Sequence, residues 1–485
     1  MTDENDGGMQ EEDMKHKRIM TGVLIILFII IYISLVCVPY RKQEGAAAKT
    51  RDSFDASDFY SDHICQDRAA ILFQNDEALE ERIRLISNAS ESIILSTFDF
   101  KADNSGKMML AALYDAAMRG VEVQILLDGF SYFIHAMGDP CFKALGILEN
   151  VTIKVYNPIN ILKPTKLMAR MHDKYLIADN TAYILGGRNT FDYFLGNDTD
   201  YKNYDWDVLV YNAGGGQDSS IEQVKTYFQS VWELDVCKIV MDSMPVISKD
   251  RITESGGELL ELYKDMQSEH SGWFERPDYV KMTTETNKIR LISNPIQAAV
   301  KEPVLFYTLT ELMIQSSEKT VFHTPYILCN DYMTERLTEL GNVNDSVWMM
   351  TNSAPNNGNP FGAVDYLIHK EEIVETGIHI MEYDAGVSYH GKCFTIGDRL
   401  TGIGSFNWDM RSAYIDTELM LVIDSKSLNT SMRKYMETYE DAALIVRDET
   451  SYSLKRGQVL QKISPKRLEK IRLLWPLDGW FRHLM

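Results

Sequence analysis

The sequence predicts an α/β protein made of two duplicated α/β/α half-domains that share one site, preceded by one transmembrane helix. Three observations lead to this fold class. A short polar motif occurs twice with the same internal spacing, both halves alternate strand-like and helix-like segments, and one long apolar run lies near the N-terminus. At 485 residues the chain is long enough for two fused half-domains.

The apolar run comes first along the chain. Residues 1–18 are polar and expected to be disordered, whereas residues 19–39 contain no charged side chain. At about 1.5 Å per residue, a helix over this stretch spans the roughly 30 Å hydrocarbon core of a bilayer. A buried helix is a poorer interpretation of so long a run between cations. A cleaved signal peptide would end in small residues, which the bulky Leu35–Pro39 segment lacks. We predict a single-pass anchor in the cell membrane, with a linker over 40–60; cations flank both ends, so the orientation stays open.

The first half, residues 61–245, shows strand and helix patterns in alternation. A helix over 78–86, a buried strand over 92–98, a helix over 107–118 and a strand over 121–127 follow one another. The Arg119-Gly120 pair is a good C-terminal stop for the second of these helices. Strand, helix and strand at this spacing form a βαβ unit, so we expect a sheet covered by helices.

The second half, residues 291–450, repeats this order. Helices are expected over 306–315, 333–340 and 363–376, and strands over 319–326, 346–351 and 378–383. Residues 246–290 lack such order and are expected to join the halves, and residues 451–485 form a basic, aromatic tail. A repeat of this size indicates duplication of a domain.

The repeated motif contains a histidine, a lysine and an asparagine. His172, Lys174 and Asn189 form the first copy, and His390, Lys392 and Asn407 form the second with identical spacing. Residues i and i+2 of a strand point to one face, so each histidine projects beside its lysine. Each asparagine follows a predicted return strand that ends in small residues, which permit close backbone approach.

Two such hairpins facing each other would suit a phosphate group. Two lysines and two side-chain amides can bind its non-bridging oxygens. One neutral imidazole can attack phosphorus, while the other, as imidazolium, can protonate the leaving oxygen and then activate water or an alcohol. Each imidazole needs an acid to set its tautomer. The sequence offers Asp207 and Glu418, each at the start of an apolar strand, although their spacing from the histidines differs between the halves.

The two motif copies resemble the signature of the phospholipase D superfamily, H-x-K-x4-D followed by G-G/S-x-N, and the resemblance covers most of residues 61–450. It implies two phospholipase D-like half-domains sharing one active site. It also implies His172 as the nucleophile, His390 as the general acid and the two lysines and two asparagines as phosphate ligands. The reverse assignment of the two histidines stays open.

One position departs from the signature. The first copy has Asp179 where the second has Gly397, with Asp398 one residue later. Both positions fall in predicted hairpin turns, where Asp, Asn and Gly are favoured for backbone reasons. We therefore expect this carboxylate to be structural.

The anchor and the resemblance together predict an enzyme that cleaves phosphodiester bonds of phospholipids through a phosphohistidine. Phospholipase D hydrolysis and cardiolipin synthase-type phosphatidyl transfer both stay open. A phospholipase D-family nuclease is the alternative enzyme, but the net charge of −21 argues against a nucleic-acid partner. An inactive membrane scaffold is the alternative of another class, and the intact motif in both copies argues against it. No cofactor is expected, and no metal, because Lys174 and Lys392 would repel a cation; oligomeric state and headgroup preference stay open.

The tail allows two interpretations. Its lysines and arginines alternate with Leu473, Trp475 and Trp480, which suits contact with an anionic lipid surface. A basic helix packed on the domain explains the same pattern.

Overall fold

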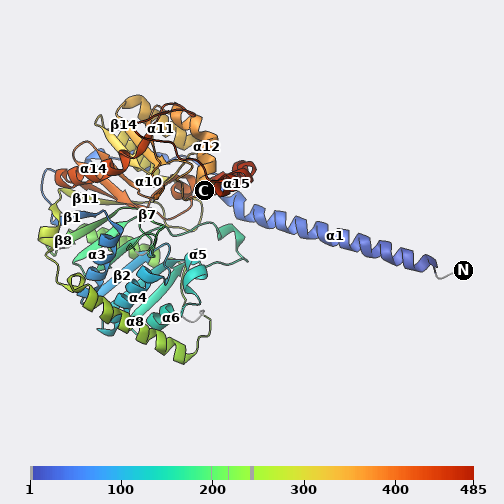
Figure 1. Ribbon diagram of the computed structural model, residues 1–485, viewed down its shortest axis with the longest axis horizontal. Helices are drawn as coiled ribbons and strands as arrows, with labels where there is room; N and C mark the ends of the chain where they lie inside the picture. Colours follow the sequence, from blue (N-terminus) through green and yellow to red (C-terminus); the bar gives the residue numbers. More distant parts are fainter. Residues whose placement is uncertain (1–3, 198, 217, 241–244) are drawn as a thin grey trace.

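The computed structural model describes residues 4–197, 199–216, 218–240 and 245–485. Two nine-stranded sheets with flanking helices form the globular body, and one long helix projects from it (Figure 1). The predicted α/β class and duplication are confirmed. Residues 1–3 of the predicted polar N-terminus, and residues 241–244 near the predicted end of the first half, lie outside the described residues.

The first sheet is built from residues of the first half and one strand of the connection. Strands β2, β3 and β4 run parallel, as the βαβ pattern predicts, and the other pairings are antiparallel. The strand order is β10 (Thr284–Glu285), β1 (Asp67–Leu72), β8 (Asp207–Asn212), β6 (Ala182–Gly186), β5 (Tyr175–Ala178), β2 (Ser92–Thr97), β3 (Glu122–Asp128), β4 (Val151–Tyr156) and β9 (Cys237–Ile239).

The second sheet repeats this topology. Its parallel strands are β12, β14 and β15, and β17 and β18 form the hairpin that corresponds to β5 and β6. The order is β11 (Lys288–Ser293), β20 (Leu419–Asp424), β18 (Leu400–Gly404), β17 (Cys393–Ile396), β12 (Thr320–His323), β14 (Val347–Asn352), β15 (His379–Tyr383), β21 (Ala443–Val446) and β22 (Tyr452–Ser453).

Helices cover both sheets. In the first half these are α3 (Asn75–Asn88), α4 (Asn104–Met118), α6 (Pro140–Gly146) and α7 (Ser220–Trp232); in the second they are α10 (Val304–Ile314), α11 (Asp331–Val343), α12 (Pro360–Glu375), α13 (Met410–Tyr414) and α14 (Lys426–Glu440). Helix α4 ends as predicted, because Gly120 adopts φ +92° just beyond it.

The two halves are packed into one body. Helix α7 contacts β11 of the second sheet, and α14 contacts β1 of the first. One hydrophobic core contains residues of both sheets, among them Val208 and Leu421. The halves therefore cannot separate without exposing core surface, and their relative position, which creates the site, is fixed by burial.

The connection between the halves is more ordered than the sequence predicts. Residues 246–290 contain α8 (Lys249–Glu269), which packs on α4 and α6, and the edge strand β10. Helix α8 buries Leu259, Tyr263 and Met266 against the first half. The irregular connection predicted here is wrong, because Leu259, Tyr263 and Met266 recur at helical spacing and form one apolar face of α8.

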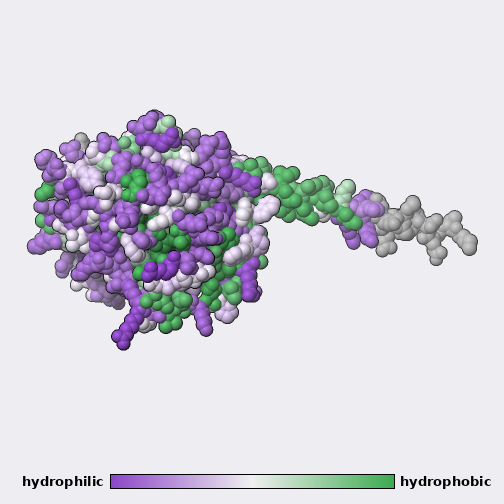
Figure 2. Space-filling model, turned by 90° about the horizontal axis from the view of Figure 1, so that it is seen from above, coloured by the Kyte–Doolittle hydropathy of each residue, from purple (hydrophilic) through white to green (hydrophobic). Residues whose placement is uncertain are grey.

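The N-terminal helix α1 runs from Glu4 to Cys37, so residues 4–18 are helical and not disordered as predicted. Its segment Met14–Tyr40 is long and apolar enough to cross a membrane, with only 6% of the apolar window buried. Figure 2 shows it as a hydrophobic rod projecting from a mainly hydrophilic body. The predicted linker, 40–60, is packed against the body, with Tyr40 and Phe59 buried.

The C-terminal tail packs on the second half through α15 (Pro465–Leu474) and α16 (Asp478–Phe481). Arg482 pairs with Asp365 at 3.0 Å, and Leu484 is buried. Leu473 and Trp480 nevertheless stay 70% and 65% exposed. The tail is thus a packed helix, and its contact with a lipid surface stays a prediction.

Candidate functional site

The two histidine motifs lie in extended segments that lead directly into β5 and β17. Each segment is held by backbone contacts with the opposite half. The His172 amide donates to the carbonyl of Thr417 at 3.2 Å, and the His390 amide donates to that of Tyr204 at 2.7 Å. Strands β7 (Asn203–Tyr204) and β16 (Ser388–Tyr389) pair in parallel beside the second motif. Each half therefore holds the histidine segment of the other half by an equivalent backbone hydrogen bond.

Each imidazole has a buried carboxylate from the opposite half behind it. His172 Nδ1 lies 2.8 Å from Glu418 Oε1, and His390 Nδ1 lies 2.6 Å from Asp205 Oδ2. Both carboxylates are fully buried, and each imidazole keeps 12% of its side chain exposed. A carboxylate at Nδ1 keeps the proton there and leaves the Nε2 lone pair free for chemistry.

Asp207 does not have the predicted role. Its carboxylate pairs with Arg82 at 2.9 Å and Arg188 at 3.1 Å, all within the first half. Strand register shows why the neighbouring acid acts instead: Gly187 bonds to the carbonyl of Trp206, as Ser405 bonds to that of Leu419. Asp205 is therefore the structural equivalent of Glu418, and Asp207 pairs with arginines of its own half.

Small residues make room for these carboxylates. A Cβ added at Gly187 would meet the Asp205 carboxylate, and the Ser405 hydroxyl donates to Glu418 Oε2. The Ser412 hydroxyl donates to Glu418 Oε1 at 2.7 Å. The small residues before each asparagine thus lie over the acids that position the histidines.

Lys174 and Lys392 are both 1% exposed and lie beside their histidines. Each ammonium donates to the carbonyl of the histidine two residues earlier, and Lys392 Nζ lies 3.4 Å from Asp205 Oδ2. Burial lowers the pKa of Lys174 to about 7, although Glu418 opposes the shift. Burial likewise lowers the pKa of Lys392. Lys392 Nζ also lies 2.6 Å from His390 Nδ1 and 3.3 Å from its Nε2. Two buried cations beside the histidines suit an anionic ligand.

Asn189 and Asn407 line the same region and are 7% and 6% exposed. Among the described residues, neither side-chain Oδ1 has a hydrogen-bond partner. Buried amides left unsatisfied are uncommon in folded proteins and indicate a ligand position. The unsatisfied amides of Asn189 and Asn407 therefore indicate a ligand position in each copy of the motif.

The pKa values of the two histidines respond to charges from both copies of the motif. Burial, with the charges of Lys174 and Lys392, lowers the pKa of His172 well below its usual value. Burial, Lys392 and Lys174 lower the pKa of His390 to about 3, against the opposing effect of Asp205. Each lysine thus acts on the histidine of the other half. Both imidazoles are therefore neutral at neutral pH.

The two histidines differ at Nε2. His390 Nε2 lies 3.3 Å from the Tyr326 hydroxyl. No hydrogen-bond partner of His172 Nε2 is found in the described part of the chain. Tyr326 was not predicted from the sequence, because nothing in its spacing repeats. A free Nε2 suits a nucleophile, and an Nε2 beside a hydroxyl suits proton transfer.

The aspartate between histidine and lysine is also unequal between the halves. Asp173 is buried and accepts hydrogen bonds from Tyr227 and Thr417, each at 2.9 Å. At the equivalent Gly391, a Cβ would clash with the Trp206 indole. The second copy therefore has glycine because the indole fills that space.

Asp179 and Asp398, the displaced pair, lie outside the histidine site. Asp179 adopts φ +53° and accepts hydrogen bonds from the amides of Glu91 at 2.8 Å and Ser92 at 2.9 Å. Gly397 adopts φ +55° at the same turn, whereas Asp398 pairs with Lys426 on the surface. The backbone conformation thus explains why glycine replaces aspartate in the second copy.

We predict opposite results for alanine at these two aspartates. Asp179→Ala should lower the free energy of unfolding by about 0.5–1.5 kcal/mol, because it removes hydrogen bonds to the amides of Glu91 and Ser92. Asp398→Ala should leave both Tm and turnover unchanged. Thermal unfolding and activity measured on both variants check this, and loss of turnover in well-folded Asp398→Ala would contradict the structural role.

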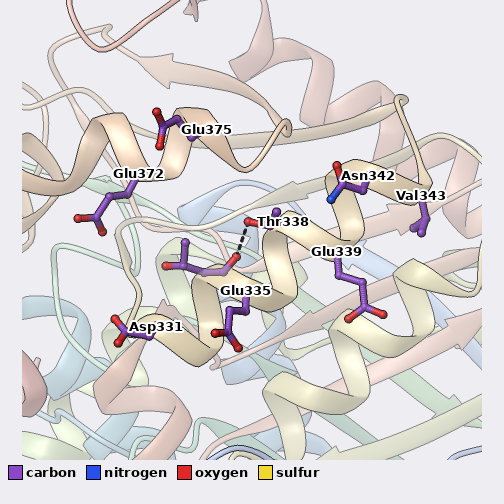
Figure 3. Close-up of a pocket in the computed structure, with 9 residues that line it drawn as sticks. Asp331, Glu335, Thr338, Glu339, Asn342, Val343, Glu372 and Glu375 are labelled. Carbon is purple, nitrogen blue, oxygen red and sulfur yellow. Dashed lines mark hydrogen bonds between the residues drawn. The ribbon is translucent and has the colours of Figure 1, made fainter.

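A separate hollow lies between α11 and α12, away from the motif residues (Figure 3). It is lined by five carboxylates and no cation: Asp331, Glu335, Glu339, Glu372 and Glu375, with Thr334, Thr338, Asn342 and Val343. Its charge does not suit a phosphate substrate, so the histidine site is the better candidate.

Comparison with known proteins agrees with the geometry. A family model described as "Cardiolipin synthase, PLD-like domain" matches residues 83–232 and 309–439, more than half of the chain. The chain belongs to this PLD-like family. The resemblance inferred from the two motif copies is thereby confirmed.

Members and structural neighbours of the PLD-like family extend the comparison. An uncharacterized protein of Helicobacter pylori is 27% identical over 75% of this chain and 78% of its own. Cardiolipin synthase C of Escherichia coli is 24% identical over 76% of this chain and 84% of its own. A phosphatidylserine synthase structure from Haemophilus influenzae matches 90% of this chain and 100% of its own with a TM-score of 0.63 at 17% identity. That structure supports the fold.

Proposed function

We propose that this protein is a membrane-anchored enzyme that cleaves a phospholipid at its phosphodiester and transfers the phosphatidyl group to a lipid alcohol, as a cardiolipin synthase does. The observation that carries the proposal is the pair of histidines, each backed by a buried carboxylate of the other half. Family membership and the similarity to cardiolipin synthase C support the lipid substrate.

In the first step, His172 Nε2 donates its lone pair to phosphorus, and the bond from phosphorus to the headgroup oxygen breaks. Glu418 accepts the Nδ1 hydrogen and stabilises the positive charge that the imidazole acquires. His390, protonated, gives its proton to the departing oxygen. The products are a phosphatidyl-histidine and the headgroup alcohol.

Binding of the substrate favours protonation of His390, which its role as the general acid requires. A phosphodiester carries one negative charge, which compensates Lys174 and Lys392. It therefore raises the pKa of His390, which those lysines and burial hold low in the empty site. Asp205 favours the resulting imidazolium.

In the second step, neutral His390 removes the proton of an incoming hydroxyl, whose oxygen attacks phosphorus. The bond from phosphorus to His172 breaks, and the imidazole returns to its starting state. Water as the acceptor gives hydrolysis, and a lipid hydroxyl gives transfer. We favour transfer because an anchored site meets lipid hydroxyls in the bilayer, and because the matching family is described as cardiolipin synthase.

A nuclease is the alternative enzyme, since a phosphohistidine site would accept nucleic-acid phosphodiesters equally well. The net charge of −21 disfavours a polyanionic partner at long range. The helix α1 also holds the site next to lipid.

The test uses purified full-length protein in nanodiscs that contain phosphatidylglycerol, without added metal. Cardiolipin and free glycerol are the expected products, and His172→Ala is the control. Phosphatidic acid alone would replace transfer with hydrolysis. Cleavage of single-stranded DNA with no lipid product would overturn the lipid substrate, and inactivity on both would favour a scaffold.

The pH dependence of kcat/KM follows from the lowered pKa values of His172, His390 and Lys174. Burial keeps His172 neutral, so the acid limb should lie well below pH 6.5. His390 has to take up a proton as the substrate binds, so kcat/KM should already decrease as pH rises towards 7. Above about pH 7, Lys174 also loses its charge and phosphate binding weakens, so the decrease should become steeper. Lys174→Arg, which stays charged, should move this limb to higher pH. An unchanged alkaline limb in Lys174→Arg would show that another group controls it.

A further inference from the structure

A second cationic hollow lies at the foot of α1, apart from the histidine pair. Its volume is about 890 Å³. Its charged lining side chains are Lys163, Lys166, Arg170, Lys238 and Asp235; its apolar lining includes Phe133, Ile159, Ile161, Leu162 and Leu167. Four cations against one carboxylate form a local positive patch in a protein whose net charge is −21. Such a hollow suits an anion with an apolar part.

Arg170 is the strongest sign of a ligand in this hollow. It is 4% exposed, and none of its Nε, Nη1 and Nη2 atoms has a hydrogen-bond partner within the described residues. Its nearest charge is Asp128, with Nη1 3.6 Å from Oδ1. A buried guanidinium without hydrogen bonds is costly, and its planar donors match phosphate oxygens.

The walls of the hollow are attached to the membrane helix. The Tyr32 hydroxyl of α1 donates to the Ile161 carbonyl at 2.9 Å, and the Tyr40 hydroxyl donates to the Thr165 carbonyl at 2.9 Å. The loop therefore follows the last two turns of α1, roughly 12 Å along its axis. The turn Pro164–Lys166 contacts α1, which Figure 1 shows projecting from the globular body.

The exposed apolar residues of the loop indicate that the hollow faces lipid. Ile161 and Leu162 are 68% and 86% exposed beside an apolar helix, where acyl chains would cover them. Lys163 and Lys166 follow within one turn of chain and would reach the phosphate layer. The hollow thus combines an apolar wall at acyl depth with cations at headgroup depth.

We propose that this hollow binds the phosphate of an anionic phospholipid from the leaflet next to the globular body. Arg170 and the three lysines bind the phosphate, and Phe133, Ile161 and Leu162 contact the acyl chains. A zwitterionic lipid fits less well, because its headgroup cation would face four cationic side chains. Binding here requires no turnover, so the site stands apart from the proposed function.

The site is nevertheless continuous with the catalytic segment. Arg170 lies two residues before His172, and its amide donates to Asp416 Oδ1 at 3.1 Å. Its carbonyl accepts a hydrogen bond from the Thr417 amide at 3.0 Å. A lipid bound by Arg170 is therefore held by the same extended segment that carries His172. This position suits a second lipid that supplies the acceptor hydroxyl to the histidine site.

The test uses photocrosslinking in the full-length His172→Ala protein, which leaves the lipid intact. The probe is phosphatidylglycerol with a photoreactive acyl chain, in detergent. Crosslinks are expected within residues 157–170. The variant K163Q/K166Q/K238Q should reduce them at least tenfold. The matched control K264Q/K319Q/K434Q changes the net charge equally at exposed lysines and should not reduce them.

Three outcomes would overturn the proposal: equal crosslinking in both triple variants, equal crosslinking by a phosphatidylcholine probe, or competition by inorganic phosphate as strong as that by unlabelled phosphatidylglycerol. The last would identify a site for soluble phosphate. Loss of turnover in the wild-type protein, with crosslinking retained, would reject the proposed function and leave this site standing.

Discussion

His390→Ala is expected to trap a covalent phosphatidyl-enzyme, whereas His172→Ala is expected to form none. The substrate for this experiment is a phosphatidyl ester of p-nitrophenol, whose leaving group departs without a proton. His172 can then attack in His390→Ala, but the second step lacks its base, so the intermediate accumulates. With a natural lipid, both variants should lose turnover, by about 10⁴-fold or more for His172→Ala.

The readout is one burst of p-nitrophenol per protein and one phosphatidyl group on a tryptic peptide that contains residue 172. His63→Ala, which removes an exposed histidine, should behave as the wild type. A burst from His172→Ala, with the adduct on His390, would reverse the two roles. The free Nε2 of His172 and the Tyr326 hydroxyl beside His390 are the reasons for the assignment made here.

Asp205→Asn is expected to lower kcat by about 10³- to 10⁴-fold without loss of folding, because it removes the carboxylate that sets the His390 tautomer. Asp207→Asn is expected to do the opposite. It breaks a fully buried pairing with Arg82 and Arg188, and such a loss costs about 3–5 kcal/mol of unfolding free energy.

Denaturant unfolding and turnover measured on both variants separate the two effects. Asp205→Asn should also change the pH profile of kcat, since His390 titrates without its partner. A folded Asp207→Asn that loses turnover, with Asp205→Asn fully active, would restore the assignment suggested by the sequence.

Much of the architecture follows from local sequence patterns. The βαβ segments, the Arg119-Gly120 helix end and the apolar run each depend on residues near one another in the chain. The apolar face of α8 is a weak signal, because Leu259, Tyr263 and Met266 lie among many polar residues. Residues 4–18 are helical despite their polar composition, because they continue the apolar helix that follows.

The sequence by itself determined the six motif residues, because duplication repeats their spacing within each copy. It also indicated Glu418 as the partner of a histidine, but its spacing suggested His390 of the same half, which is wrong because Glu418 contacts His172. Only the tertiary structure decided that acids and histidines pair across the halves, over 246 residues for Glu418 and His172 and 185 for Asp205 and His390. Strand alternation sets which side chains share a face within one strand. The register between strands and the packing of one half on the other decide which of two nearby acids faces the partner, and those depend on the whole shared core.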